Sequence, residues 1–191
     1  MEQLRMICKM RSIPEFKIED GYTIRNYRPG DEVVWTKICK FGLLEENEGI
    51  ECWQKYMLDL DNLVPERDTF FACDKDGNPV ATCTAFVPEK NTGLIHMVGA
   101  LPESRGHYLG YSLTVYGLEK LNNELSCNNK MVCLKSDDWR LSALKIYLKC
   151  GFQPVLFDVG MEERWTDILN KLDIHGVEML DDNGNETGII L

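Results

Sequence analysis

Long apolar runs are missing from this chain of 191 residues. No segment approaches the roughly 18 consecutive apolar residues that a membrane-spanning helix needs. The N-terminus carries Arg5, Lys9 and Arg11 where a secretory signal peptide requires an unbroken apolar stretch. We therefore expect a cytoplasmic protein without a membrane partner.

Metal-ligand and disulfide patterns are also missing. The eight cysteines include no Cys-x-x-Cys pair, and none stands at zinc-ligand spacing from a histidine. We therefore expect no bound metal. Cys83 and Cys133 lie inside apolar runs, where a free cysteine behaves as a small hydrophobic side chain. Thiols used in this way indicate a reducing compartment.

Acidic residues outnumber basic ones overall, but the basic residues are concentrated locally. The formal net charge of −10 argues against nonspecific binding to nucleic acid or to an anionic membrane. Residues 104–153, however, hold seven basic and four acidic side chains, whereas residues 158–191 hold two basic and nine acidic ones. The basic window suits a small phosphorylated ligand. The acidic end either attracts a cationic ligand, if it borders a binding site, or only keeps the protein soluble.

Composition and length indicate one globular domain. The chain is 44% hydrophobic and 27% charged, close to the averages of folded domains, and it shows no internal repeat or linker. We expect a single domain over residues 1–175, with a core at about 20–172. An acidic extension over 176–191 is expected to form either an added edge hairpin or a mobile end.

Hydrophobic periodicity predicts the order β-α-α-β-β-β-α-β-α-β-α. Strands are expected at residues 22–28, 69–74, 80–87, 93–101, 131–135 and 152–159. Helices are expected at about residues 33–44, 49–60, 108–125, 140–149 and 162–172.

One strand-to-helix connection carries most of the chemical information. In residues 98–110, ValGlyAlaLeuProGluSerArgGlyHisTyrLeuGly, a strand runs into a loop containing Arg105, Gly106 and Gly110 and then directly into a long helix. The free N–H groups and the dipole of a helix N-terminus favour an anion, and glycine lets a phosphate approach. The standard dinucleotide and nucleotide phosphate loops, GxGxxG and GxxxxGK[ST], are both absent. The segment is either a phosphate site or simply a tight turn.

The window from Ile95 to Phe152 resembles the GCN5-related N-acetyltransferase (GNAT) superfamily. AlaLeuProGluSerArgGlyHisTyrLeuGly at 100–110 is similar to the family's strand, Val-x-Pro-type sequence and Arg-Gly-x-Gly-x-Gly loop, which cradles the pyrophosphate of acetyl-CoA. Residues 131–152 are similar to its later strand and helix, which ends in Tyr-x-x-x-Gly-Phe. The resemblance implies an α+β fold with α/β/α layers. Its mixed, mostly antiparallel sheet would contain a splayed parallel strand pair and carry flanking helices.

Two positions depart from the family pattern. Tyr108 stands at the usual middle glycine, and we expect it to take a negative φ at the helix start and to offer its own N–H. Arg140 stands where many members have asparagine. It either reaches a phosphate of coenzyme A, or it is a solvated residue at the helix start or pairs with Asp137 or Asp138.

The resemblance also implies a set of residues that bind acetyl-CoA. The pantetheine arm would pair with the strand around Val98 and Ala100, with Gly99 between them at a bulge, and a freed N–H of Val98 or Ala100 would polarise the thioester carbonyl. The complete predicted set is Val98, Gly99, Ala100, Arg105, Gly106, His107, Tyr108, Leu109, Gly110, Tyr111, Arg140 and Tyr147.

Two residues are candidates for proton transfer. Tyr147 matches the tyrosine of the family that protonates the departing thiolate, and its alternative role is that of a core aromatic residue. By the two-residue period of a strand, His96 lies on the same face as Val98 and Ala100, so it is a candidate base, directly or through water. Its alternative role is structural. His107 is expected either to assist phosphate binding or to be merely exposed.

The resemblance implies an acetyl-CoA-dependent N-acetyltransferase that acetylates a primary amine of a small molecule or peptide in a ternary complex. The partners would be acetyl-CoA and an amine, and the protein would be a monomer or homodimer. Two alternatives stay open: acetylation of protein or ribosomal N-termini, and a noncatalytic acyl-CoA-binding module. Because the segment after Phe157 leads into a helix and not into an obvious hairpin, a small substrate is favoured.

Overall fold

A seven-stranded sheet forms the centre of the computed structural model, which describes residues 2–11, 13–89, 91–126 and 130–190. The strands follow the order β2-β3-β4-β5-β6-β1-β7, and only β5 and β6 pair in parallel. Their bounds are β1 Leu4–Cys8, β2 Thr23–Asn26, β3 Thr69–Cys73, β4 Pro79–Glu89, β5 Thr92–Ala100, β6 Met131–Ser136 and β7 Gln153–Pro154. The expected mixed, mostly antiparallel sheet is confirmed.

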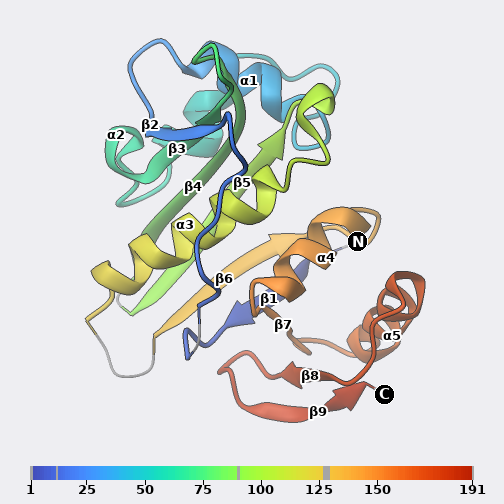
Figure 1. Cartoon of the computed structure of the whole chain (residues 1–191). Helices are drawn as coiled ribbons and strands as arrows, with labels where there is room; N and C mark the ends of the chain where they lie inside the picture. The colour runs from blue at the N-terminus through green and yellow to red at the C-terminus, as the bar shows by residue number, and fades with distance from the viewer. Residues whose placement is uncertain (1, 12, 90, 127–129, 191) are drawn as a thin grey trace.

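Helices cover both faces of the sheet (Figure 1). On one face, a Cβ added to Gly117 of α3 would lie within 3.2 Å of side chains of Ile95, Ala85 and Phe70, so this helix packs closely on β3, β4 and β5. On the other face, a Cβ at Gly99 would meet Leu43 and Ile38 of the α1 region. The helices are α1 Glu32–Cys39, α2 Pro65–Asp68, α3 Leu109–Glu124, α4 Leu141–Lys149 and α5 Met161–Leu172. The layered α/β/α arrangement is therefore confirmed.

Two expected elements are shorter than their patterns suggested. The helix expected at 49–60 is reduced to a π-helical turn at Gln54–Leu58. The residues before this turn form turns of their own, in which the Glu51 carboxylate accepts a hydrogen bond from the Gly49 N–H. The strand expected at 152–159 is only Gln153–Pro154, because Pro154 offers no N–H to a ladder and the chain then bridges to another sheet at Val155.

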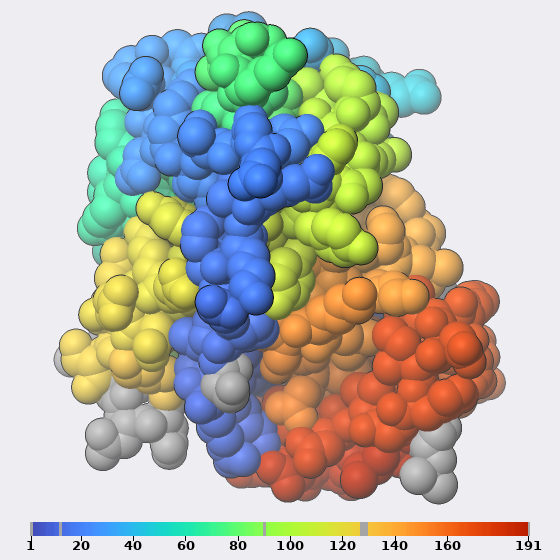
Figure 2. All heavy atoms as spheres, viewed as in Figure 1, coloured from blue at the N-terminus to red at the C-terminus, as the bar shows by residue number. Residues whose placement is uncertain are grey.

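The N-terminal strand β1 was not predicted. It lies between β6 and β7 and pairs antiparallel with both, so the first residues of the chain are central to the sheet. After β1, the chain crosses the front of the molecule and passes over α3 (Figure 2). The ring of Phe16 packs edge-on at 5.8 Å from that of Tyr116 in α3.

The acidic C-terminal residues form a separate two-stranded sheet of β8 Val177–Leu180 and β9 Glu186–Ile190. Its carboxylates pair with the basic N-terminal strand, Asp182 with Arg5 at 3.2 Å and Glu186 with Lys9 at 3.0 Å. This hairpin lies beside β7, as the bridge from Val155 to Leu180 shows. Two carboxylates of the acidic C-terminal segment therefore pair with basic residues of the N-terminal segment.

Seven of the eight cysteines lie in the described part of the chain, and all seven are free thiols. Six of them are buried, and Cys133 is half-buried; Cys127 falls outside the described residues. No described helix has the length and apolar character needed to cross a membrane.

Candidate active site

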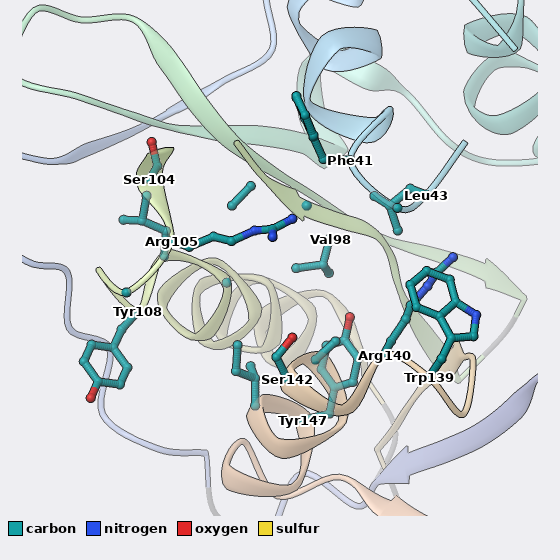
Figure 3. Close-up of a pocket in the computed structure, with 18 residues that line it drawn as sticks. Phe41, Leu43, Val98, Ser104, Arg105, Tyr108, Trp139, Arg140, Ser142 and Tyr147 are labelled. Atoms are coloured by element: carbon teal, nitrogen blue, oxygen red, sulfur yellow. The ribbon is translucent and has the colours of Figure 1, made fainter. Parts of the chain in front are cut away.

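A cavity of about 400 Å³ opens where β5 and β6 separate (Figure 3). The parallel pairing of these strands ends at Leu94 and Cys133, so β6 does not cover the edge of β5 beyond that point. The cavity is lined by Phe41, Gly42, Leu43, Val98, Gly99, Ala100, Ser104, Arg105, Gly106, Tyr108, Leu109, Gly110, Trp139, Arg140, Ser142, Ala143, Ile146 and Tyr147. The lining therefore comes from the segment after α1, from β5, from the loop before α3 and from α4 with the residues just before it.

A β-bulge shapes the β5 wall, but not at the glycine where it was expected. Thr82 pairs with Gly99 and Thr84 with His96, so two steps along β4 match three along β5. The extra residue lies in the Met97–Val98 stretch, and Met97 has a φ of 50°. The bulge also reverses the alternation of side chains. His96 therefore shares a face with Gly99, and the expectation that it shares one with Ala100 is wrong.

The loop before α3 contains main-chain N–H groups that are free to donate hydrogen bonds. Among the described residues, the main-chain N–H groups of residues 106–111 have no hydrogen-bond acceptor. The side chain of Arg105 extends toward the centre of the cavity, and no described carboxylate pairs with it. A helix N-terminus adds a partial positive charge of about half a unit. The loop is therefore suited to bind an anion with several oxygen atoms.

Tyr108 adopts the conformation of the glycine that it replaces. Its φ of 54° and ψ of 18° lie in the left-handed region, so the expected negative φ is wrong. The side chain is 70% exposed and points away from the cavity. The backbone geometry of the loop is thus retained at the cost of local strain.

We expect Tyr108→Gly to increase the free energy of unfolding by about 0.5–1 kcal/mol. The left-handed conformation costs an ordinary residue about 1–2 kcal/mol, and glycine removes this strain. Glycine also makes the unfolded chain more flexible, which lowers the free energy of unfolding by about 0.5–1 kcal/mol and offsets part of the gain. Urea unfolding measures the difference. Tyr108→Ala removes the same ring but keeps the strain, so an equal gain in that control would show that the ring and not the backbone is responsible.

Helix α4 places Tyr147 on the wall opposite β5. Its hydroxyl points into the cavity toward Val98, and no described residue forms a hydrogen bond with it. Burial, with a smaller contribution from the nearby Cys83 thiol, raises the pKa of the phenol, which therefore keeps its proton at neutral pH. The ring is 6% exposed and packs edge-on against Phe152.

Arg140 lies at the other end of the cavity from the loop, next to Trp139. Its Nη2 forms an ion pair with Asp137 at 2.9 Å, and its guanidinium carbon lies 4.8 Å from the centre of the Trp139 ring. Asp138 pairs instead with Arg164, whose Nε lies 3.1 Å from that carboxylate. Of the two roles considered for Arg140, the ion pair with Asp137 is present, and the residue also lines the cavity.

Three of the predicted site residues, His96, His107 and Tyr111, do not belong to the cavity lining. The Nε2 of His96 lies 3.0 Å from the Tyr56 carbonyl oxygen, and burial lowers the pKa of the ring despite that hydrogen bond. The Nδ1 of His107 lies 2.9 Å from a carboxylate oxygen of Glu19 in the crossing N-terminal segment. A direct or water-mediated role for His96 stays a prediction.

Several lining residues were not predicted. Ser142, Ala143 and Ile146 were accessible to sequence reasoning, since they lie four or five residues before Tyr147 or directly beside it in α4. Phe41, Gly42 and Leu43 follow α1 and meet the cavity only because this segment packs over Gly99. No local pattern marks them.

Comparison with known proteins identifies the family. The model of the acetyltransferase (GNAT) family matches residues 35–152, more than half of the chain. The chain belongs to the GNAT family. The match includes β5, the loop, α3, β6 and α4, which together supply most of the cavity lining.

Curated relatives are only distantly similar. A mycothiol acetyltransferase from Thermomonospora curvata is 28% identical over 168 residues, which cover 83% of this chain and 55% of the relative. One from Streptomyces griseus is 28% identical over 158 residues, which cover 80% of this chain and 50% of the relative. The chain thus spans about half the length of these curated relatives.

Solved structures share the fold. A GCN5-related N-acetyltransferase from Sphaerobacter thermophilus superposes with a TM-score of 0.61 at 20% identity, covering 80% of this chain and 48% of that one. A chain of the NatC complex bound to Gag peptide and CoA gives a TM-score of 0.53 at 19% identity, covering 67% of this chain and 82% of that one.

Proposed function

We propose that this GNAT protein transfers the acetyl group of acetyl-CoA to a primary amine of a small molecule. The observation that carries the proposal is the anion-binding loop at one end of a cavity that passes between splayed strands, with a protonated tyrosine beside it. The curated relatives, which are named mycothiol acetyltransferases, support acetyl as the group transferred. Helix α5 follows β7, which favours a small acceptor, as the sequence does.

The residues present fit acetyl-CoA. The free N–H groups of residues 106–111 and the guanidinium of Arg105 suit its pyrophosphate, and Val98, Gly99 and Ala100 offer an uncovered strand edge to the pantetheine arm. Acetyl-CoA supplies a thioester as the acyl donor. In a direct transfer, the amine forms the new C–N bond as the C–S bond breaks.

The chain itself supplies donors for this transfer. Tyr147 donates its hydroxyl proton to the departing sulfur, and a main-chain N–H at Val98 or Ala100 polarises the carbonyl oxygen. The surplus proton of the amine passes to water, because the described residues that line the cavity include no Asp, Glu or His. Tyr147 regains its proton from solvent.

Thermal unfolding with coenzyme A and acetyl-CoA, paired with thiol release against a panel of amines, tests the proposal. We expect both ligands to raise the Tm and thiol release to require an amine. A higher Tm without thiol release from any amine would indicate a noncatalytic binding module. No effect of either ligand would overturn the assignment of the cavity to coenzyme A.

Arg105→Gln is expected to raise the KM for acetyl-CoA by about 10- to 100-fold, since a hydrogen bond to a charged group contributes about 1.5–3 kcal/mol. Steady-state thiol release measures it. Lys145→Gln is the matched control, because it removes a positive charge from the same basic window at an exposed position outside the cavity lining. Equal changes in both variants would assign the effect to net charge and not to the loop.

A further inference from the structure

The end of the cavity away from the phosphate loop has its own chemical character. Phe41, Leu43 and Trp139 form its apolar part, and Arg140 is its charged group (Figure 3). Trp139 is 67% exposed and Phe41 47% exposed, although both are large apolar side chains. Exposed aromatic residues at the mouth of a cavity are suited to contact a ligand.

At this mouth, Trp139, just before α4, lies next to the segment that follows α1. Its ring lies 3.6 Å from the position of a Cβ added to Gly42, in the segment after α1, while Trp139 itself precedes α4. Gly42 has a φ of 108°, which ordinary residues rarely adopt. The indole therefore borders the cavity beside the segment that follows α1.

Electrostatics at this end favour an anion. The two charged side chains among the described lining residues are Arg105 and Arg140, so no carboxylate of the lining would hold a cationic group. The ion pair with Asp137 is formed through Nη2 of Arg140. The Nε of Arg140 is buried without a hydrogen-bond partner, a costly state that an anionic oxygen of a ligand would relieve after a small side-chain movement.

We propose that Arg140 binds the acceptor and that the acceptor is a primary amine bearing an anionic oxygen group in the same small molecule. Asp137 and Trp139 position the guanidinium, and Phe41 and Leu43 contact the apolar part of the acceptor. This assignment rests on the proposed acetyl transfer. It gives Arg140 a different role from the coenzyme A contact expected from the sequence, while Arg105 keeps the phosphates.

Matched pairs of acceptors test the assignment by thiol release. L-Phenylalanine and its amide differ in a carboxylate, and O-phosphoethanolamine and ethanolamine differ in a phosphate. We expect the native protein to prefer the anionic member of at least one pair by about tenfold or more in kcat/KM, as a charge-assisted hydrogen bond provides. The two pairs distinguish a carboxylate from a phosphate.

Two substitutions separate the roles of the arginines. Arg140→Gln should reduce the preference for the anionic acceptor to about twofold in kcat/KM and leave the KM for acetyl-CoA nearly unchanged. Arg140→Lys should retain part of the preference for the anionic acceptor. Arg105→Gln should raise the KM for acetyl-CoA and leave the preference intact. A retained rise in Tm with coenzyme A shows that each variant is folded.

Three results would overturn the inference. The first is equal or better use of the neutral member in both pairs, and the second is a rise in the KM for acetyl-CoA in Arg140→Gln with an unchanged preference. The third is binding of coenzyme A without turnover of any of the four amines. Loss of coenzyme A binding in the native protein would instead contradict the proposed function itself.

Discussion

Tyr147→Phe is expected to lower kcat by about 10²- to 10⁴-fold, the usual contribution of a positioned proton donor. The hydroxyl opens onto the cavity and has no partner among the described residues, an arrangement that a purely structural tyrosine rarely shows when buried. Burial raises its pKa, so the phenol is protonated at neutral pH and can donate to a leaving thiolate. Steady-state thiol release with a saturating amine measures kcat.

The same substitution preserves the packing of the ring. Phenylalanine keeps the edge-on contact with Phe152, whose ring centre lies 6.1 Å away, so we expect little change in Tm. The KM for acetyl-CoA should also change little, because the phosphates are held at the loop. Unchanged turnover in Tyr147→Phe would remove this hydroxyl from the mechanism and leave it a core aromatic residue.

The raised pKa of the Tyr147 phenol also predicts how kcat/KM depends on pH. Since the shift is upward, deprotonation of Tyr147 does not limit the rate at any pH near neutrality, and any acidic limb of kcat/KM reports protonation of the amine acceptor. The limb should therefore move when the acceptor is exchanged for one of different basicity. A limb that stays fixed for all acceptors would indicate an ionising group of the protein, with His96 the first residue to substitute.

Local patterns predicted the elements that carry the site. The loop around Arg105 and Gly106 follows from glycine and charge placed before a periodic helix. The periodic pattern also predicts the helix that contains Tyr147, whereas the role of Tyr147 came from the resemblance of residues 131–152 to the GNAT pattern. These features depend on residues close together in the sequence, where propensity and periodicity are informative.

Strand β1 and the bulge in β5 could not be predicted, because both depend on pairing between residues that are far apart in the sequence. Strand β1 contains Arg5, which interrupts its apolar run, yet the guanidinium lies over the Phe157 ring at 4.0 Å and pairs with Glu2 and Asp182. The bulge near Met97 is defined only by the register of β4 and β5, and Met97 itself gives no signal of a positive φ. The same register places the His96 side chain on the face of the sheet opposite to that of Ala100.

A buried carboxylate holds the helix that presents the loop. Asp68 is fully buried, and its oxygens accept hydrogen bonds from the Val64 N–H at 2.8 Å, from Arg67 at 2.8 Å and from Lys120 of α3 at 2.9 Å. Burial alone would raise the pKa of Asp68, but these hydrogen bonds and the charge of Lys120 outweigh it and lower the pKa. Asp68 thus connects α2 to the helix whose N-terminus lines the cavity.

Asp68→Asn is expected to lower the free energy of unfolding at pH 7 by about 2–4 kcal/mol. Breaking a buried ion pair costs about 3–5 kcal/mol, and Lys120 here keeps two other partners, Glu124 and the Ala85 carbonyl oxygen, which reduces the loss. Because the folded pKa is lowered, the native carboxylate contributes stability above its unfolded pKa of about 4, and this is lost as the pH falls through the folded value. The difference between native protein and variant should therefore narrow at low pH.

Urea unfolding at pH 7 and at about pH 3 measures both effects, and Glu124→Gln is the matched control. That carboxylate pairs with the same Lys120 at 2.8 Å but is 34% exposed, so its loss should cost about 0.5 kcal/mol or less. Lys120 lies eleven residues after Leu109, about 16 Å along the helix, so the KM for acetyl-CoA should change little in either variant. Equal destabilisation by Asp68→Asn and Glu124→Gln would contradict the role given to burial, because both substitutions remove one carboxylate from the same lysine and differ mainly in access to water.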